Sequence, residues 1–198
     1  MTPGTESQAA RSSRSLATLS PGMQDAVQAL QARLQVDGVR VLPLDAYRSP
    51  WDQARAYRQG HTWPQIRAME DRLTHLDWAG FAVILRAVGP QYGLRVTEAP
   101  PGQSWHQWGD AWDACPWVDS GSLSRLAWEP RPGDPDYNEA VRLWQRYGRL
   151  AEQCGLVWGG HWGDAPHVQC RDMGAVPLVT VGRPLAAARA EELGWWHA

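Results

Sequence analysis

Four side chains of the sequence have the types and spacing that a hydrolytic metal centre requires. His106 lies in the segment SWHQWGDAWD, Asp113 follows it seven residues later, and His167 ends the segment DAPH. Zinc in hydrolytic sites takes three protein ligands, commonly histidine and carboxylate, and leaves a fourth position for water. Such an ion lowers the pKa of water to about 7 and polarises a carbonyl group. Asp164, three residues before His167, could then serve as a general base.

Residue types and spacing alone leave a second interpretation open. In it, a tryptophan-rich loop carries the same histidines and aspartates, and these side chains only make hydrogen bonds. Asp110 also competes with Asp113 as the carboxylate ligand, because both follow His106 closely. Spacing therefore indicates a possible metal centre without deciding its ligand set.

The surrounding sequence pattern predicts an α+β domain. Helical spacing of apolar residues, proline near helix starts and glycine at helix ends predict helices at 20–38, 50–60, 62–93, 136–154 and 184–193. Short β-branched or apolar runs predict strands at 39–44, at 111–118 and on both sides of the loop in LVWGGHWGDAPHVQC. Residues 1–19 are rich in Ser, Thr, Ala and Arg without periodicity, so we expect a flexible segment before one domain at 20–198.

Composition excludes several function classes. All 19 basic residues are Arg, which rules out a pyridoxal Schiff base and the lysines of Walker-type loops and kinases. The net charge of −2 and the lack of a long apolar run predict binding to neither nucleic acid nor membrane. Cys115, Cys154 and Cys170 form no CxxC pair, so we expect small buried residues; whether Cys115 pairs with Cys170 stays open.

Three segments, in order along the chain, resemble the motifs of the LAS zinc peptidases. SWHQWGDAWD is similar to the S-x-H-x-x-G-x-A-x-D motif of this group, which includes VanY-like D-Ala-D-Ala carboxypeptidases. WGGHWGDAPHVQ and AYRSPWDQARAYRQGHT resemble two motifs of its L-alanyl-D-glutamate endopeptidase branch, to which phage endolysins belong. The resemblance covers roughly residues 40–170.

The resemblance implies a fold, a cofactor and a set of roles. The fold would be a small antiparallel sheet that carries the site, flanked by helices as in the hedgehog and D-Ala-D-Ala peptidase structures. One zinc ion would be bound by His106, Asp113 and His167, since the G-x-A-x-D register favours Asp113 over Asp110. Asp164 would be the catalytic base. Arg48 would steady the substrate carbonyl and the developing oxyanion, a role that suits a permanently charged guanidinium.

Further residues match the motifs less directly. Ser104 and Gln53 fall on recurrent motif positions, where we expect hydrogen bonds to substrate or to the ligands. His161 stands where relatives carry Asp, and contact with substrate, support of a ligand and a surface position all stay open. The tryptophans near the motifs are Trp105, Trp108, Trp112, Trp158 and Trp162. They could form an aromatic wall for a sugar and peptide, but we expect core packing for most of them. Trp158 is the one expected to contact substrate or a ligand.

Residues 63–93 replace a shorter connection in relatives. We expect this insertion to be helical, and either a lid over the cleft or a packing element.

The expected function is zinc-dependent hydrolysis of the peptidoglycan stem peptide at the bond between L-Ala and D-Glu. A D,D- or L,D-carboxypeptidase with the same site and a non-catalytic wall-binding module are the alternatives. We expect a monomer that is made in the cytoplasm without a visible signal peptide. It would act on the cell wall after phage-lysin-like release or by an unrecognised export route.

Overall fold

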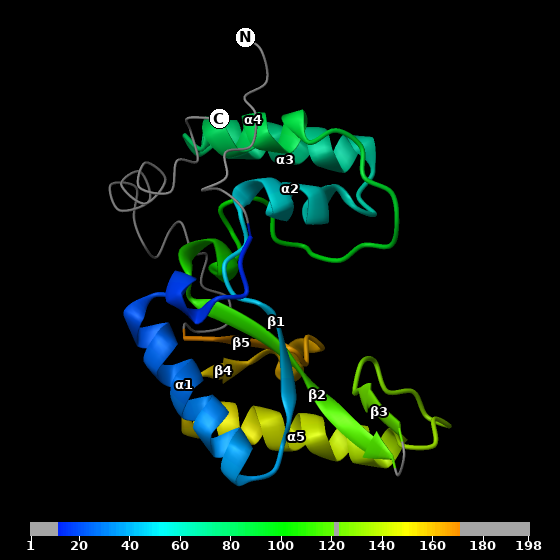
Figure 1. Ribbon diagram of the computed structural model, residues 1–198. Helices are drawn as coiled ribbons and strands as arrows, with labels where there is room; N and C mark the ends of the chain where they lie inside the picture. Colours follow the sequence, from blue (N-terminus) through cyan, green and yellow to red (C-terminus); the bar gives the residue numbers. More distant parts are fainter. Residues whose placement is uncertain (1–11, 121–122, 171–198) are drawn as a thin grey trace. The chain divides into compact units, whose positions relative to one another are not determined.

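The structure is a computed structural model that describes residues 12–120 and 123–170 (Figure 1). By its internal contacts the chain divides into two compact units, and the single domain expected at 20–198 stays a prediction. Of the described residues, the first unit holds Ser12 and 48–107, and the second holds 13–47, 108–120 and 123–170. The expected helix at 184–193 and most of the expected flexible segment lie outside the described residues.

The second unit is built on a small antiparallel sheet. Its strands are β1 (Val41–Asp45), β2 (Ala111–Ser120), β5 (His167–Gln169) and β4 (Val157–Trp158), in that spatial order, and β3 (Leu123–Leu126) also pairs with β2. All these pairings are antiparallel. The predicted α+β fold with a small antiparallel sheet and flanking helices is therefore confirmed, although the sequence analysis did not predict β3.

Two long helices cover this sheet. α1 (Pro21–Val36) begins with proline in its first turn, and α5 (Tyr137–Gln153) follows the proline-rich connection after β3. Figure 1 shows both helices alongside the strands. The predicted apolar stripe of α1 is buried, and it shares one core with the inner faces of α5 and β2; the stripe comprises Met23, Val27, Leu30 and Leu34.

In the described part of the first unit lie the α-helices α2 (Pro50–Arg58), α3 (Trp63–His75) and α4 (Ala79–Ala87). α3 and α4 occupy the expected insertion, and Asp77 between them adopts a left-handed backbone conformation with φ of 62°. Arg58 of α2 is buried and donates a hydrogen bond of 2.8 Å from Nη1 to the carbonyl of Leu85 in α4. This hydrogen bond joins the insertion to α2.

The segment before α1 is tied to the second unit. Ser13 forms a bridge with Tyr47, η2 (Leu16–Thr18) follows, and Leu19 is buried in the core. These residues belong to the segment that the sequence analysis expected to be flexible, and their backbone hydrogen bonds and burial fix them locally.

Three further properties concern the described residues only. No helix within 12–120 or 123–170 combines the length and apolar character needed to cross a bilayer. Cys115 and Cys154 are free thiols. Burial raises the pKa of the Cys115 thiol to about 11, which matches the expected role of a small buried side chain.

Candidate metal centre

Asp113 and His167 are direct partners across the pairing of β2 with β5. Opposite residues in an antiparallel pair carry their side chains on the same face of the sheet. Asp113 Oδ1 lies 3.0 Å from His167 Nδ1, although the two residues are 54 positions apart in the sequence. The strand register therefore brings two of the predicted ligands together.

His106 supplies the third potential ligand. It lies in the short helix η3 (Trp105–Trp108) and is 2% exposed. One ligand atom each from His106, Asp113 and His167 lie within 4.8 Å of one another, so these residues could hold one metal ion. Two imidazole nitrogens and one carboxylate oxygen form a donor set that suits zinc with an open fourth position.

Gly109 makes the chain reversal between η3 and β2 possible. Its φ of +72° lies in the left-handed region, and an added Cβ would approach the Ser20 nitrogen and the Thr18 oxygen to 2.9 Å. Both the conformation and the close approach favour glycine. The turn between His106 and Asp113 therefore depends on a residue without a side chain.

Asp110, the competing carboxylate, has a different role. It is buried, and it accepts a hydrogen bond of 2.5 Å from the hydroxyl of Ser20, the residue that precedes α1. The group that could hold a metal contains Asp113 and not Asp110. The structure thus agrees with the register of the motif.

Both ring nitrogens of His167 have side-chain partners. Nδ1 faces Asp113, and Nε2 lies 3.0 Å from Oε1 of Gln169. The ring of Trp162 also lies edge-on to the imidazole, with centroids 6.1 Å apart. Burial lowers the pKa of His167, but the hydrogen bond and charge of Asp113 and the charge of Asp164 outweigh burial and raise it. The negative charge around the site therefore favours a cation here, either a proton or a metal ion.

Asp164 is exposed on the loop that precedes β5. Its N–H donates to the carbonyl of Gly159 at 2.9 Å, and its own carbonyl accepts from the His167 N–H at 3.1 Å. Its charge contributes to the raised pKa of His167, so the carboxylate is electrostatically coupled to a predicted ligand. This position, accessible and next to the ligand set, is suited to a general base.

Trp158 holds this loop in place. Its indole N–H donates to the carbonyl of Ala165 at 2.8 Å. Gly148 of α5 and Gly160 of η4 (Gly159–Trp162) both abut the indole, and a Cβ at either glycine would lie 2.2 Å from a ring carbon. Trp158 thus contacts the backbone between Asp164 and His167.

Tyr147 of α5 is a residue of this region to which the sequence analysis assigned no role in the site. Its hydroxyl donates to the carbonyl of Pro166 at 3.2 Å, directly before His167. Burial, followed by the charges of Asp113 and Asp164, raises the pKa of Tyr147 well above its ordinary value, so the phenol stays neutral. No local pattern in the sequence indicates this contact, because the hydroxyl of a helical residue reaches it across the core.

In the first unit, Arg48 and Gln53 form a connected pair. The Arg48 N–H donates to the carbonyl of His106 at 3.2 Å, which links the predicted oxyanion-stabilising residue to the chain at a predicted ligand. Arg48 Nη1 also donates to Oε1 of Gln53 at 3.2 Å, and the buried Gln53 amide donates to the carbonyl of Ala99 at 2.6 Å. Ser104, nearly buried, accepts from the Gln107 N–H through its carbonyl.

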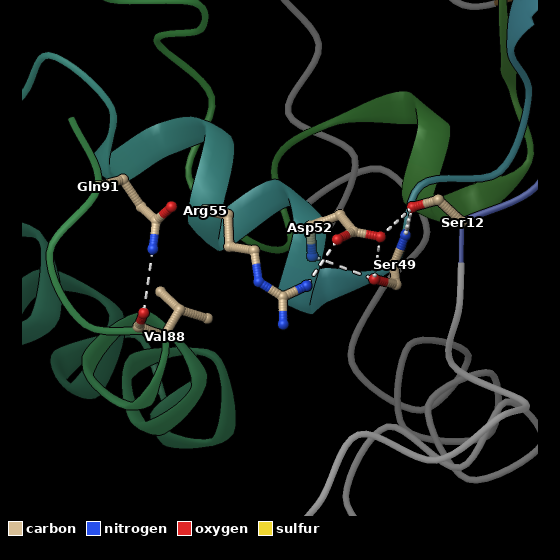
Figure 2. Close-up of polar contacts among 6 residues, drawn as sticks. All are labelled: Ser12, Ser49, Asp52, Arg55, Val88 and Gln91. Atoms are coloured by element: carbon tan, nitrogen blue, oxygen red, sulfur yellow. Dashed lines mark hydrogen bonds and ion pairs between the residues drawn. The ribbon is translucent and has the colours of Figure 1, made fainter. Parts of the chain in front are cut away.

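The start of α2 fixes the chain directly after Arg48. Figure 2 shows Ser49 as the N-cap residue, whose hydroxyl oxygen accepts from the Asp52 N–H at 3.1 Å. The Asp52 carboxylate accepts from the Ser12 hydroxyl at 2.5 Å and from Arg55 Nη1 at 2.7 Å. This network holds the first turn of α2, and so the orientation of the backbone that carries Arg48 and Gln53.

His161 is not a member of the group that could hold a metal. Its Nε2 contacts Oε1 of Glu152 at 2.5 Å, and its side chain is 54% exposed. Three of the five tryptophans near the motifs are buried, in line with the expected core packing of most of the group. Trp105, Trp108 and Trp112 are buried, Trp158 is half-buried, and Trp162 is 41% exposed beside His167.

Comparison with known families then decides the relationship of the chain. A model of the VanY family, described as D-alanyl-D-alanine carboxypeptidase, matches residues 16–126, more than half of the chain. The chain belongs to this family. A second model with the same description, Peptidase_M15_4, matches residues 97–170, which include all three potential ligands. The chain is therefore a peptidase by family, and both the predicted family resemblance and the predicted enzyme class are confirmed.

Similar solved structures are distant in sequence. One is a variant of the vancomycin-resistance D,D-pentapeptidase VanY from a VanB-type cassette, in complex with Zn(II), at 12% identity and a TM-score of 0.41, covering 91% of this chain and 84% of that one. Another is the LdcB LD-carboxypeptidase, at 12% identity and a TM-score of 0.38, covering 90% of this chain and 67% of that one. No curated protein sequence matches the chain.

Proposed function

We propose that this chain is a zinc-dependent hydrolase of the peptidoglycan stem peptide that cleaves the bond between L-Ala and D-Glu. The observation that carries the proposal is the group of His106, Asp113 and His167, which could hold one ion in a chain of a peptidase family. The choice of bond is supported by the motifs around Asp164 and Arg48, which resemble the endopeptidase branch. Its substrate lies in the cell wall, so the protein would act there.

The donor set fits zinc. Two imidazoles and one carboxylate leave a net charge of +1 on a divalent ion and one position open. His106 and His167 are almost fully buried, which keeps competing water away from two of the three ligands. When bound there, zinc would supply Lewis-acid chemistry, lowering the pKa of water and polarising the scissile carbonyl.

Asp164 and Arg48 have the chemistry that the remaining steps need. A carboxylate oxygen of Asp164 would take the proton of the attacking water and return it to the leaving amine nitrogen, a role that requires an accessible group beside the ligands. The Arg48 guanidinium would neutralise the negative charge that develops on the carbonyl oxygen. Its Nη1 contact with Gln53 would restrict the side chain before substrate binds.

A D,D- or L,D-carboxypeptidase is the second candidate, favoured by a specific observation. Both family models carry the description D-alanyl-D-alanine carboxypeptidase, and together they match residues 16–170. The same ligands, base and arginine would serve this reaction, with a terminal D-Ala as the leaving group. The two candidates differ in the peptide that occupies the site and not in the chemistry.

Mass spectrometry of purified peptidoglycan, digested with the zinc-loaded protein, tests the proposal. New L-Ala carboxyl ends paired with new D-Glu amino ends are expected, and free D-Ala would establish the carboxypeptidase instead. Asp164→Asn should abolish either product while zinc remains bound, and Asp25→Asn, at an exposed carboxylate of α1, should digest normally. A protein that binds zinc and wall but forms no new ends would be a binding module, and the proposal would be wrong.

A further inference from the structure

We propose that Gln169 is a positioning residue that determines which nitrogen of His167 binds the metal ion. The inference rests on the metal site of the proposed function and adds a residue to which no role has been assigned. Gln169 would hold the proton of His167 on Nε2, so that Nδ1 presents its lone pair to the ion.

The geometry places the two residues on one face of β5. His167 and Gln169 are two positions apart on the strand, so their side chains project to the same side. They are 9% and 5% exposed, and Gln169 Oε1 lies 3.0 Å from His167 Nε2. On the other side of the ring, Nδ1 lies 3.0 Å from Asp113 Oδ1. Asp113 is itself a predicted ligand, so Nδ1 is the nitrogen that faces the candidate metal centre.

The chemistry of imidazole then assigns a role to the amide oxygen. A neutral imidazole has one N–H and one lone pair, and only the lone pair binds a metal. A carbonyl-type oxygen accepts hydrogen bonds only, so Oε1 favours the form with the proton on Nε2 and the lone pair on Nδ1. Removing this acceptor would cost the buried Nε2–H its hydrogen bond to Oε1.

The backbone of Gln169 takes part in strand pairing, which a change of its side chain leaves in place. The residue pairs with Ala111 of β2 and with Val157 of β4 through the strand ladder. A Gln169→Met variant keeps the length and volume of the side chain and removes the acceptor. A Gln169→Glu variant keeps an acceptor oxygen and removes the amide donors. These two variants therefore separate the acceptor from packing and from the NH₂ group.

Zinc affinity, measured by competition with a chromophoric chelator, is the first readout. Loss of an outer partner of a metal-bound histidine typically lowers affinity by about 10–100-fold, and we expect this loss for Gln169→Met and retention within a few-fold for Gln169→Glu. The matched control is Gln153→Met, at an exposed glutamine that ends α5, which should bind zinc normally. Equal zinc affinity in the Gln169→Met variant and the unaltered protein would overturn the proposal.

Nitrogen-15 NMR of the ring of His167 in the unaltered, zinc-loaded protein is the second readout and needs no variant. The expected result is a protonated Nε2 and a metal-bound Nδ1; zinc on Nε2 would contradict the proposal directly. If the unaltered protein binds no zinc, the proposed function itself fails. If it binds zinc through Nδ1 and Gln169→Met binds zinc equally well, the inference about Gln169 fails alone.

Discussion

The contact between Gly160 and the indole of Trp158 leads to a quantitative prediction for a single methyl group. In Gly160→Ala, the new Cβ would lie 2.2 Å from Cζ2 of Trp158, whereas carbon atoms in contact are normally about 3.5–4.0 Å apart. The indole must therefore move by more than about 1 Å, which is incompatible with its 2.8 Å hydrogen bond to the carbonyl of Ala165.

The expected loss of stability is the sum of two effects, overpacking around the indole and the loss of its hydrogen bond. Overpacking a well-filled core costs about 1–3 kcal/mol, and a lost hydrogen bond of a partly buried donor costs about 1 kcal/mol more. We therefore expect the free energy of unfolding to fall by about 3 kcal/mol. For a chain of 198 residues this corresponds to a drop in Tm of roughly 6–12 °C.

Thermal and urea unfolding of the metal-free protein, followed by tryptophan fluorescence and circular dichroism, measure this change. Gly22→Ala is the matched control, because a Cβ at Gly22 meets no atom within 4 Å and the residue lies in the first turn of α1. Alanine there should leave the free energy of unfolding unchanged or raise it slightly. Equal stability of the Gly160→Ala and Gly22→Ala variants would refute the assigned packing of Trp158.

Three further predictions concern the candidate centre and the helix that follows Arg48. Asp113→Asn should lower zinc affinity by more than about 100-fold, beyond the loss caused by an outer partner, whereas Asp110→Asn should retain zinc and lose stability; the reverse pattern in isothermal titration would exchange their roles. Because the pKa of His167 is raised and the metal needs a neutral Nδ1, zinc affinity should fall about tenfold per pH unit below that raised pKa and level off above it. In the metal-free protein, the charged imidazole should stabilise the fold most below about pH 6.5, and this stabilisation should be lost as pH rises through the raised pKa. An affinity that does not change between pH 8 and pH 5 would contradict this. Ser49→Ala should cost about 1 kcal/mol in urea unfolding through loss of the N-cap of α2, and an unchanged midpoint would show that the cap is not needed.

Local residue types and spacing suggested the potential ligands, and the resemblance to the family motif was needed to favour Asp113 over Asp110. His106 and Asp113, two of the potential ligands, are only seven positions apart, and the segment DAPH, which ends at His167, supplies the third. The antiparallel register of β2 and β5 then completes the group. The apolar stripe of α1 was predictable for the same reason, since helical periodicity is a local pattern.

Other features depend on contacts between distant segments. β3 is four residues long and contains Ser and Arg, so its strand character comes from pairing with β2 rather than from its own pattern. The hydroxyl of Tyr147 reaches Pro166 only through the packing of α5 on the sheet. Gln169 was predictable in principle, because a polar side chain two residues after His167 on a strand shares its face.

The direct pairing of Asp113 with His167 has a consequence for the cohesion of the sheet. β5 has three residues, and among the described strands β4 pairs with β5 alone, so the short β2–β5 ladder attaches both strands to the rest of the sheet. An ion bound to both side chains would act as a removable cross-link across that ladder, closing a span of 54 residues. At a free concentration one hundred times its Kd, it would add about 2.7 kcal/mol to stability. Chelation should therefore speed hydrogen exchange at Val168. The supply of metal would then determine how stably β4 and β5 remain attached to the sheet.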